Sequence, residues 1–303
     1  MEKNYLQVND EIKTAIKEKK PVVALESTLI SHGLPHPLNV EVALEAESQL
    51  RALGVTPATV AIINGVLQVG IDGKQIELIG SDTEVSKVSI NNIGKVLSTQ
   101  SLGATTVAST MFAAHKAGIK TFATGGIGGV HRGSHIDISA DLKALSTIPV
   151  AVICAGVKAI LDIPKTLEVL ETLGVPVIGY KTEIFPEFWT RGRDLKLAIT
   201  SNSAKRTAEI LSIHWGIGLN TGQLVAVPIP KEKALDQALV EKAIIESISI
   251  AESKEINGSD LTPFLLKKVS EVSNGLTLSA NIDLIINNVK VAGEISKELA
   301  ALN

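Results

Sequence analysis

Three junctions of the same design recur along the chain and constrain its fold more than any other feature. Each joins the end of a helical pattern to a strand of β-branched residues through one glycine, at Gly54, Gly118 and Gly174. Glycine adopts positive φ without the steric penalty of a Cβ, so it ends a helix just before the chain turns into a strand. Repetition of this step predicts a layered α/β protein with a mostly parallel sheet and right-handed crossovers.

Short apolar runs and helical periodicity divide most of the chain into alternating elements. Strands are expected at residues 21–26, 59–64, 119–124, 149–155, 175–179 and 224–227, and helices at 39–53, 106–117, 141–146, 164–173, 203–214, 233–254, 262–273 and 279–299. An Asp72-Gly73 pair between segments 66–70 and 75–80 predicts a hairpin turn. We find neither a linker nor a repeat, and therefore expect one domain over residues 1–303, a three-layer α/β/α fold with a helical C-terminal part.

Composition narrows the class of protein. Aromatic residues make up only 3% of the chain, so Ile, Val, Leu and Ala must form the core, as is common where parallel strands are buried on both faces. The net charge of −3 provides no basic surface for a nucleic-acid polymer, so any nucleotide ligand is small. Cys154 is the single cysteine and lies in an apolar strand, which predicts a core position.

The same data suggest a cellular location. One cysteine cannot form an intrachain disulfide, which fits a reducing compartment. The first twenty residues are polar and charged, and no stretch reaches the roughly 18 apolar residues of a membrane span. We therefore expect a cytoplasmic protein without a membrane partner.

Polar residues that follow the predicted strands are the first candidates for chemistry, because open α/β sheets bind ligands beyond the carboxyl ends of their strands. Glu26 ends the first strand, where it is placed for general acid–base work, or caps a helix or pairs with a lysine. A glycine-rich segment, 125–129, follows another strand and allows backbone N–H groups to approach an anion. It matches neither the P-loop nor the dinucleotide pattern. A mobile turn with His131 and Arg132 in solvent is the alternative.

Asp137 and Lys158 are further candidates. One or two carboxylates plus water suit Mg²⁺ or Mn²⁺ near a phosphate, although Ser139 and Asp141 beside Asp137 match an ordinary helix N-cap. Lys158 follows the strand at 149–155, where burial favours the neutral amine that attacks a sugar carbonyl to form a Schiff base. A surface lysine at a helix start is the alternative.

Asparagines on the last apolar helix form another unusual feature. Asn281, Asn287 and Asn288 are costly there unless they are hydrogen-bonded. They either face a ligand or satisfy neighbouring backbone groups, and composition does not decide between the two.

Taken in order, these segments resemble the pseudouridine-5′-phosphate glycosidase family. The resemblance covers most of the chain from about Pro21 to the end, and AGVK together with ATGGIGGVHRG and DISADL is its most specific part. The other matching pieces are VVALESTLISHGLP, GATTVASTM, ICAGVKAILD, GYKTEIFPEF, TPFLL and LSANIDLIINN.

The resemblance implies a homotrimeric α/β/α enzyme, a pseudouridylate synthase with one Mn²⁺ per subunit. Such an enzyme reversibly splits pseudouridine 5′-phosphate into uracil and ribose 5-phosphate through ring-opened sugar. By their places in the motifs, Lys158 would form the covalent sugar adduct, Glu26 would protonate the ring oxygen or the uracil, and Asp137 would bind Mn²⁺. The substrate contacts match Lys87, Val107, Ser139, Ala140 and Asp141, and the pocket lining matches Thr124, His131 and Asn281.

The reaction explains these residue types. A C-glycosidic bond joins two carbons, so protonation of a heteroatom leaving group cannot cleave it, and the paired carboxylates of ordinary glycosidases are insufficient. A lysine that holds C1′ of the opened sugar turns the cleavage into a retro-aldol-like step. A lysine nucleophile, an acid–base carboxylate and a metal supply what that step needs.

The chain departs from the family pattern in four places. Residues 90–92 stand where an arginine pair is usual, the loop between His131 and Asp137 is shorter, and segment 188–194 lacks a Ser-Gly pair and a later arginine. The fourth is Val272 or Ser273, where a threonine is usual before the late glycine. The departures around Ile90 and Arg191 motivate one alternative, a C-glycosynthase that joins ribose 5-phosphate to a different ring. A non-catalytic sugar-phosphate-binding protein is a second alternative. A carbohydrate kinase is a third, although no ATP phosphate loop is recognisable.

Overall fold

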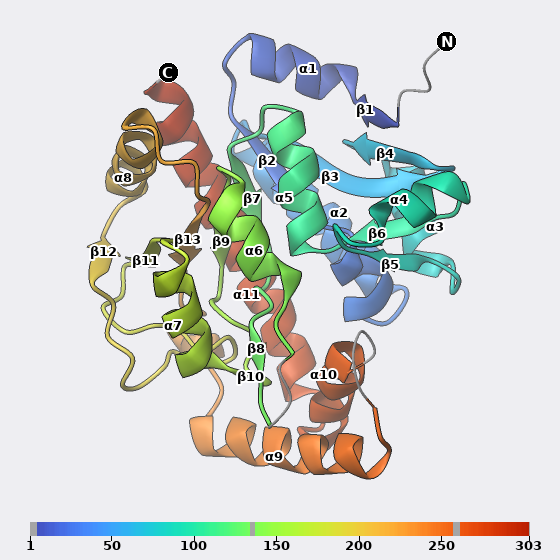
Figure 1. The fold of residues 1–303 in the computed structure, drawn as a ribbon, viewed down its shortest axis with the longest axis vertical. Helices are drawn as coiled ribbons and strands as arrows, with labels where there is room; N and C mark the ends of the chain where they lie inside the picture. The colour runs from blue at the N-terminus through green and yellow to red at the C-terminus, as the bar shows by residue number, and fades with distance from the viewer. Residues whose placement is uncertain (1–4, 134–136, 257–260, 303) are drawn as a thin grey trace.

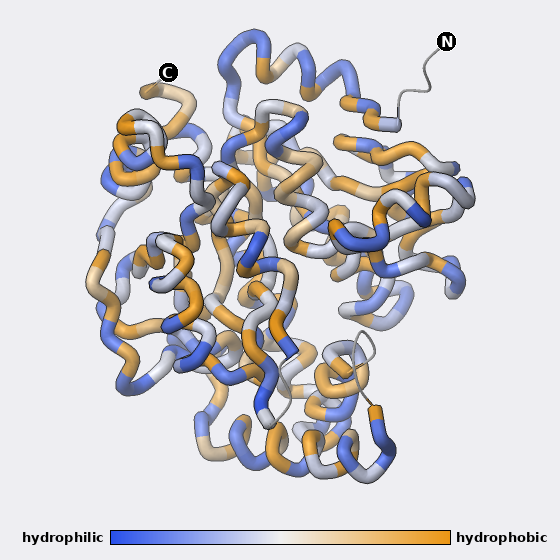
Figure 2. The backbone as a smooth tube through the Cα atoms, viewed as in Figure 1, coloured by the Kyte–Doolittle hydropathy of each residue, from blue (hydrophilic) through white to orange (hydrophobic). Residues whose placement is uncertain are grey.

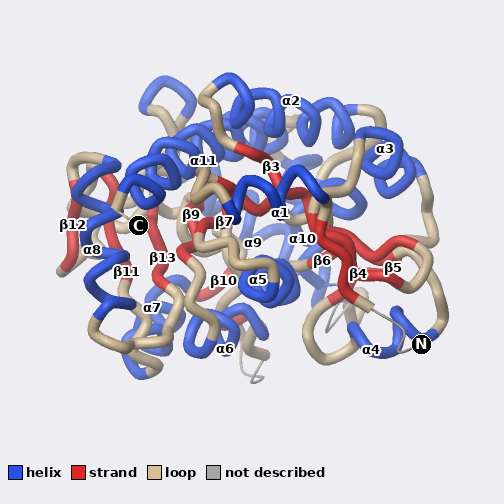
Figure 3. Tube along the Cα trace, turned by 90° about the horizontal axis from the view of Figure 1, so that it is seen from above, coloured by secondary structure: helices blue, strands red, loops and turns tan. Residues whose placement is uncertain are grey.

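The computed structural model describes residues 5–133, 137–256 and 261–302. Its centre is a long twisted sheet with helices on both faces (Figures 1 and 3). The expected three-layer α/β/α fold with a helical C-terminal part is confirmed. Both described ends of the chain lie at the same end of the molecule, opposite α9 (Figure 1).

Thirteen labelled strands make up the sheets of the described part of the chain. They are β1 (Leu6–Val8), β2 (Val22–Leu25), β3 (Thr56–Ile63), β4 (Val66–Val69), β5 (Ser86–Val88), β6 (Gly103–Thr105), β7 (Thr121–Ala123), β8 (Val130–His131), β9 (Ala151–Cys154), β10 (Leu161–Asp162), β11 (Val177–Tyr180), β12 (Ile199–Ser201) and β13 (Gln223–Ala226). The main sheet runs β1-β4-β3-β2-β7-β9-β13-β11-β12, with β6 and β5 attached to β3.

Pairing in the main sheet is parallel from β3 through β2, β7, β9, β13 and β11 to β12. The antiparallel pairs are β3 with β4 and β3 with β6. Because the carboxyl ends of β2, β7 and β9 meet at one edge of the sheet, the segments that follow them are brought together. A small antiparallel pair, β8 with β10, lies beyond that edge.

The helices divide between the two faces of the sheet. They are α1 (Asp10–Lys17), η1 (Leu29–Gly33), α2 (Leu38–Ala52), α3 (Gly73–Ser81), α4 (Ile93–Ser98), α5 (Val107–Lys116), α6 (Ala140–Thr147), α7 (Ile163–Thr172), α8 (Ala204–Gly216), η2 (Lys231–Lys233), α9 (Gln237–Ser253), α10 (Leu261–Val272) and α11 (Leu276–Ala301). The helices α2, α8 and α11 pack together on one face, and α5, α6 and α7 lie on the other (Figure 3).

The core follows from the apolar strands. All residues of β2, β9 and β13 are buried, because helices cover both faces of the sheet at these strands. Hydrophobic segments accordingly gather in the middle of the molecule, and hydrophilic ones in the outer turns (Figure 2). The predicted junction glycines are confirmed: Gly54, Gly118 and Gly174 have φ of 73°, 83° and 67°. Cys154 is fully buried, as predicted, and burial raises the pKa of its thiol to about 12.

The predicted hairpin at Asp72-Gly73 is wrong. Asp72 is instead the N-cap of α3: its side chain accepts a hydrogen bond from the backbone of Gln75, and the Gln75 side chain accepts one from the backbone of Asp72. An aspartate before a helix competes with the turn preference of the Asp-Gly pair, and this reciprocal cap decides the competition. Segment 75–80 is therefore helical.

The C-terminal helices close the molecule. The helix α11 crosses the face of the sheet that carries α2 and α8, and α9 and α10 form a hairpin beyond the carboxyl edge (Figure 1). The helix α10 also approaches η1. Among the residues that the structure describes, no helix combines the length and apolar character of a membrane span.

Candidate active site

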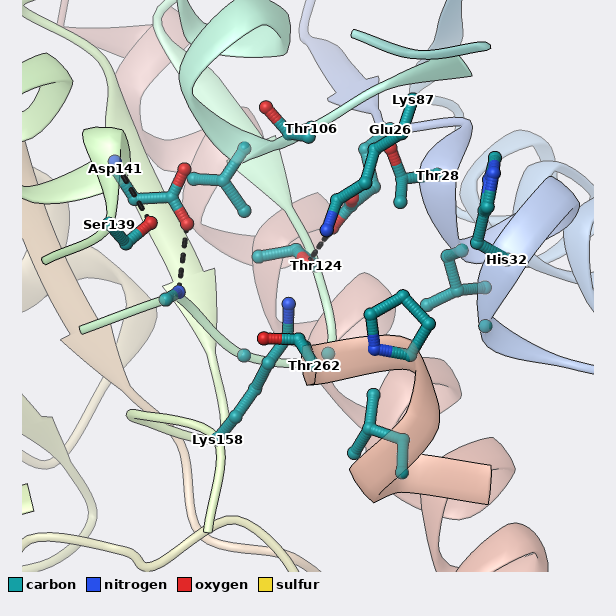
Figure 4. A pocket seen from close by; sticks show the side chains of 18 of the residues that line it. Glu26, Thr28, His32, Lys87, Thr106, Thr124, Ser139, Asp141, Lys158 and Thr262 are labelled. Atoms are coloured by element: carbon teal, nitrogen blue, oxygen red, sulfur yellow. Dashed lines mark hydrogen bonds between the residues drawn. The ribbon is translucent and has the colours of Figure 1, made fainter. Parts of the chain in front are cut away.

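A cavity of about 640 Å³ opens beyond the carboxyl ends of β2, β7 and β9. Its walls come from η1, the loop after β7, the segment after β9, and the N-terminal ends of α5 and α6 (Figure 4). The helices α10 and α11 complete it with Thr262, Leu266 and Ile285. This is the place where open α/β sheets bind ligands, and the volume lies in the range of small-molecule sites.

Every site residue predicted from the sequence lines this one cavity, although the residues come from several separate segments. The set is Glu26, Lys87, Val107, Thr124, His131, Asp137, Ser139, Ala140, Asp141, Lys158 and Asn281. The individual roles that the sequence assigns to them stay predictions.

Glu26 follows β2 and accepts a hydrogen bond from the hydroxyl of Thr124, which follows the neighbouring strand β7. Burial raises the pKa of the Glu26 carboxyl above its usual value. The charge of Lys158, the Thr124 hydrogen bond and the charge of Lys87 act in the opposite direction, whereas Asp141 adds to the rise. Figure 4 shows Lys87 and Lys158 reaching into the space beside Glu26 and Thr124. A carboxyl group in this setting keeps its proton at a higher pH than an exposed glutamate, which suits a general acid.

Lys158 sits in a tight turn between β9 and β10. Its backbone N–H donates to the carbonyl of Ile127, and its carbonyl accepts from Leu161. The β8–β10 pairing joins His131 to Leu161, so the segment that carries Lys158 lies beside the segment that carries His131. Two regions distant in sequence thus deliver a lysine and a histidine to the same cavity.

Arg132 ties this turn to α9. Its Nε donates to the Leu161 carbonyl and its Nη2 to the Ala159 carbonyl, both at 3.1 Å. The guanidinium also forms a two-pronged ion pair with Glu241 of α9, at 2.7 and 3.3 Å. The alternative of a solvated arginine is therefore wrong: the guanidinium is bonded on both sides, which suits its planar fork of donors.

The glycine-rich segment is a close-packed loop, and part of its backbone is already bonded. The N–H groups of Ile127 and Gly128 donate to the Gly156 carbonyl and to Asp141. A Cβ at Gly126 would lie 2.7 Å from the Phe188 ring, and one at Gly128 would collide with Ser139. Glycine is therefore required here for contact with neighbouring side chains, a reason that differs from the expected approach to an anion.

Asp141 braces the loop against α5. The residue is 6% exposed. Its Oδ1 accepts from the backbone of Ala108 at 3.0 Å and its Oδ2 from Gly128 at 2.8 Å. Both oxygens are therefore bonded to the protein, so Asp141 has a structural role in the cavity wall in addition to any contact with a ligand.

Asp137 is the candidate metal ligand. Its side chain is 42% exposed, and one carboxylate oxygen lies 3.9 Å from Nε2 of His131. Burial lowers the pKa of His131, which favours the neutral imidazole. No group of three or more His, Cys, Asp or Glu gathers as a metal site within the described residues. A hard cation that keeps most of its water needs only one or two carboxylates, so a lone carboxylate such as Asp137 is compatible with a site for such a cation.

The three asparagines of α11 differ in what they contact: two satisfy backbone groups, and one lines the cavity. Asn288 donates to the carbonyls of Thr124 and Gly125, and Asn287 donates to Pro228, so both satisfy backbone groups. Asn281 lines the cavity and accepts a hydrogen bond from the indole N–H of Trp189. One of the three thus faces the cavity.

Several lining residues were not singled out from the sequence: His32, Phe188, Thr262, Pro263 and Leu266. His32 lies in η1, where its ring is hydrogen-bonded to Ser31, and burial lowers its pKa. The motifs that contain them, ISHGLP, FPEF and TPFLL, carried the signal. Periodicity alone gave no reason to prefer them.

Known proteins are similar to this chain over nearly its whole length. The family model described as "Indigoidine synthase A like protein" matches residues 11–298. A pseudouridine-5′-phosphate glycosidase of Clostridium botulinum is 50% identical over 306 residues, which is 100% of both chains. The Escherichia coli protein of that name is 48% identical over 98% of this chain and 96% of its own.

Two solved structures have the same fold over nearly the whole chain. The prealnumycin C-glycosynthase AlnA in complex with ribulose 5-phosphate has a TM-score of 0.91 and 38% identity, covering 99% of this chain and 98% of its own. An indigoidine synthase A-like protein from Thermotoga maritima has a TM-score of 0.90 and 33% identity, covering 98% and 97%.

Proposed function

The chain belongs to the pseudouridine-5′-phosphate glycosidase family, and from that premise we propose that it reversibly cleaves the C-glycosidic bond of pseudouridine 5′-phosphate. The products are uracil and ribose 5-phosphate. The observation that carries the proposal is the gathering of Lys158, Glu26 and Lys87 in one cavity of nucleotide size.

In this proposal Lys158 is the nucleophile. Its neutral amine attacks C1′ of the sugar while the C1′–O4′ bond breaks and O4′ takes the proton of Glu26. The new C–N bond leaves a charged amine, which returns a proton to the Glu26 carboxylate. The raised pKa of Glu26 supports this part, because a glutamate must carry a proton near neutral pH to act as an acid.

The carbon–carbon bond then breaks. The nitrogen lone pair forms a C=N bond to C1′, and the electrons of the C1′–C5 bond pass to the uracil ring, which takes at C5 the proton that Glu26 has regained. Water hydrolyses the iminium on Lys158, which frees the amine and the aldehyde of ribose 5-phosphate. Each step is reversible, so the same residues serve synthesis.

The phosphate is proposed to bind near the N-terminal ends of α5 and α6. Val107 and Ala140 are the first residues of these helices, and both line the cavity together with Lys87. Helix N-termini carry partial positive charge and attract phosphate. Asp137 would hold Mn²⁺, which supplies further positive charge for the anionic oxygens of the nucleotide.

A homotrimer and a cytoplasmic location complete the proposal. Both are expectations from the family resemblance and from the single cysteine. Light scattering of the purified protein tests the first, and fractionation of the source cells tests the second.

A second candidate function is that of a C-glycosynthase with a different acceptor ring. The likeness to the solved C-glycosynthase favours it, at 38% identity over nearly the whole chain. The departures from the family favour it too, because Asn91 and Asn92 line the cavity where an arginine pair is usual. Direct competition between uracil and other rings for ribose 5-phosphate separates the two candidates.

The test of the proposed function mixes the protein with Mn²⁺, uracil and ribose 5-phosphate, and follows pseudouridine 5′-phosphate by chromatography. Lys158→Ala runs beside it, and borohydride reduction followed by mass spectrometry reports the sugar adduct. Product and adduct with wild type alone support both the reaction and the lysine. Full activity of Lys158→Ala would refute the lysine mechanism, and no product from wild type would refute the proposed reaction.

A further inference from the structure

The indole of Trp189 and the amide of Asn281 form a buried pair at the cavity wall. Trp189 is completely buried, and its Nε1–H donates to Oδ1 of Asn281 at 2.6 Å. Trp189 comes from the segment after β11, and Asn281 from the first turns of α11. Asn281 also lines the cavity, so one side of its amide meets the indole while the side chain borders the ligand space.

This hydrogen bond fixes which way the amide faces. An indole nitrogen can only donate, so the atom of Asn281 that it meets must be the carbonyl oxygen. The oxygen and nitrogen of an asparagine amide otherwise look alike, and either could face a ligand. Among the described residues no acceptor takes the NH₂ group of Asn281. The side chain is therefore held with its donors available.

The wall around this amide suits a flat ring. Phe188, Leu266 and Ile285 line the same cavity as Asn281, and the Phe188 ring packs edge-on to Trp189, the partner of Asn281, at 5.1 Å between centroids. Phe188 holds φ at 65°, a conformation that costs a residue with a Cβ free energy and that clusters at functional sites. A planar, mostly apolar ring with polar edges matches an apolar wall that carries one amide.

We propose that Trp189 determines the base specificity of the site by holding Asn281 as a hydrogen-bond donor for a carbonyl oxygen of the base. This inference rests on the proposed function and goes beyond it, because it gives a role in base recognition to Trp189, which is itself buried away from the ligand. Trp189 is a positioning residue: it acts through Asn281, which makes the contact.

The experiment measures discrimination between ring oxygen and ring sulfur, because sulfur is the weaker acceptor. Uracil competes with 2-thiouracil and with 4-thiouracil for ribose 5-phosphate. We expect wild type to prefer uracil over the analogue altered at the contacted position by about tenfold, the value of one hydrogen bond. Trp189→Phe keeps an aromatic ring and removes the donor, so the preference should fall towards parity.

The matched control is Trp215→Phe. Trp215 is the other tryptophan of the chain, and its indole donates to the Thr221 carbonyl outside the cavity. It should keep the wild-type preference. Borohydride trapping of ribose 5-phosphate on Lys158 reports the sugar half of the reaction and should be equal in all three proteins, because no base takes part.

A second variant covers the case in which Trp189→Phe does not fold. Asn281→Asp keeps an oxygen for the indole and turns an oxygen towards the base, so its preference for uracil should also vanish. An unchanged preference in an active Trp189→Phe, or in an active Asn281→Asp, would overturn this inference alone. Absence of product from wild type would overturn the proposed function and this inference with it.

Discussion

Replacement of Asp141 by asparagine tests most directly whether this residue holds the glycine-rich loop against α5. The carboxylate accepts one backbone hydrogen bond on each oxygen, and the residue is 6% exposed. An asparagine side chain at this position would accept only one of the two bonds and turn its NH₂ group towards the other backbone N–H. Loss of one charge-assisted bond and one unsatisfied buried N–H together cost about 3 kcal/mol. A chain of this length has an unfolding entropy of roughly 0.6 kcal/mol/K at its midpoint, so the Tm should fall by about 5 °C.

The assay is thermal unfolding of the ligand-free protein followed by circular dichroism. The matched control is Asp236→Asn, since Asp236 caps α9 at the surface with a single bond to Leu239 and asparagine is an equally good cap. Its Tm should stay within about 1 °C of wild type. An Asp141→Asn protein with an unchanged Tm would refute the brace and leave ligand contact as the reason for the residue.

Two further predictions concern the proposed acid, Glu26, and the ion pair between Arg132 and Glu241. Thr124→Val removes a bond that lowers the pKa of Glu26, so this pKa should rise, and activity that needs the protonated acid should decline at higher pH than in wild type. A pH profile of kcat/KM for cleavage checks this, with Thr124→Ser unchanged; a shift to lower pH contradicts it. Glu241→Gln leaves Arg132 without its charged partner. The substitution should lower the free energy of unfolding by less than about 1 kcal/mol, because the pair is partly exposed. It should nevertheless slow borohydride trapping several-fold. The control Glu209→Gln, in the surface pair with Arg206, should alter neither the free energy of unfolding nor the trapping rate.

Local rules were enough for much of the fold. The junction glycines, the apolar strands and most helices follow from periodicity and from the conformational freedom of glycine, which act within a few residues. The short strands β1, β5, β6 and β12 escaped prediction, because each lacks the longer apolar run that marked the equally short β7. The error at Asp72 arose where two local preferences competed, and the side chain of Gln75 decided between them.

The gathering of the candidate site residues in one cavity was also predictable, because polar residues at the carboxyl ends of parallel strands must share one edge of the sheet. Residue types alone did not separate contact with a ligand from contact with the protein. Asp141 and Arg132 are bonded to backbone groups or to a distant helix, and Asn288 differs from Asn281 only in what surrounds it.

The sequence by itself thus determined the alternating layers, the edge of the sheet at which the candidate site lies, and the family. Tertiary structure alone decided which way each polar side chain faces. The physical reason is that a buried donor or acceptor must find a partner, and for these residues the partner comes from a segment far along the chain. Trp189 lies 92 positions from the amide that it orients, and no local pattern reports such a bond.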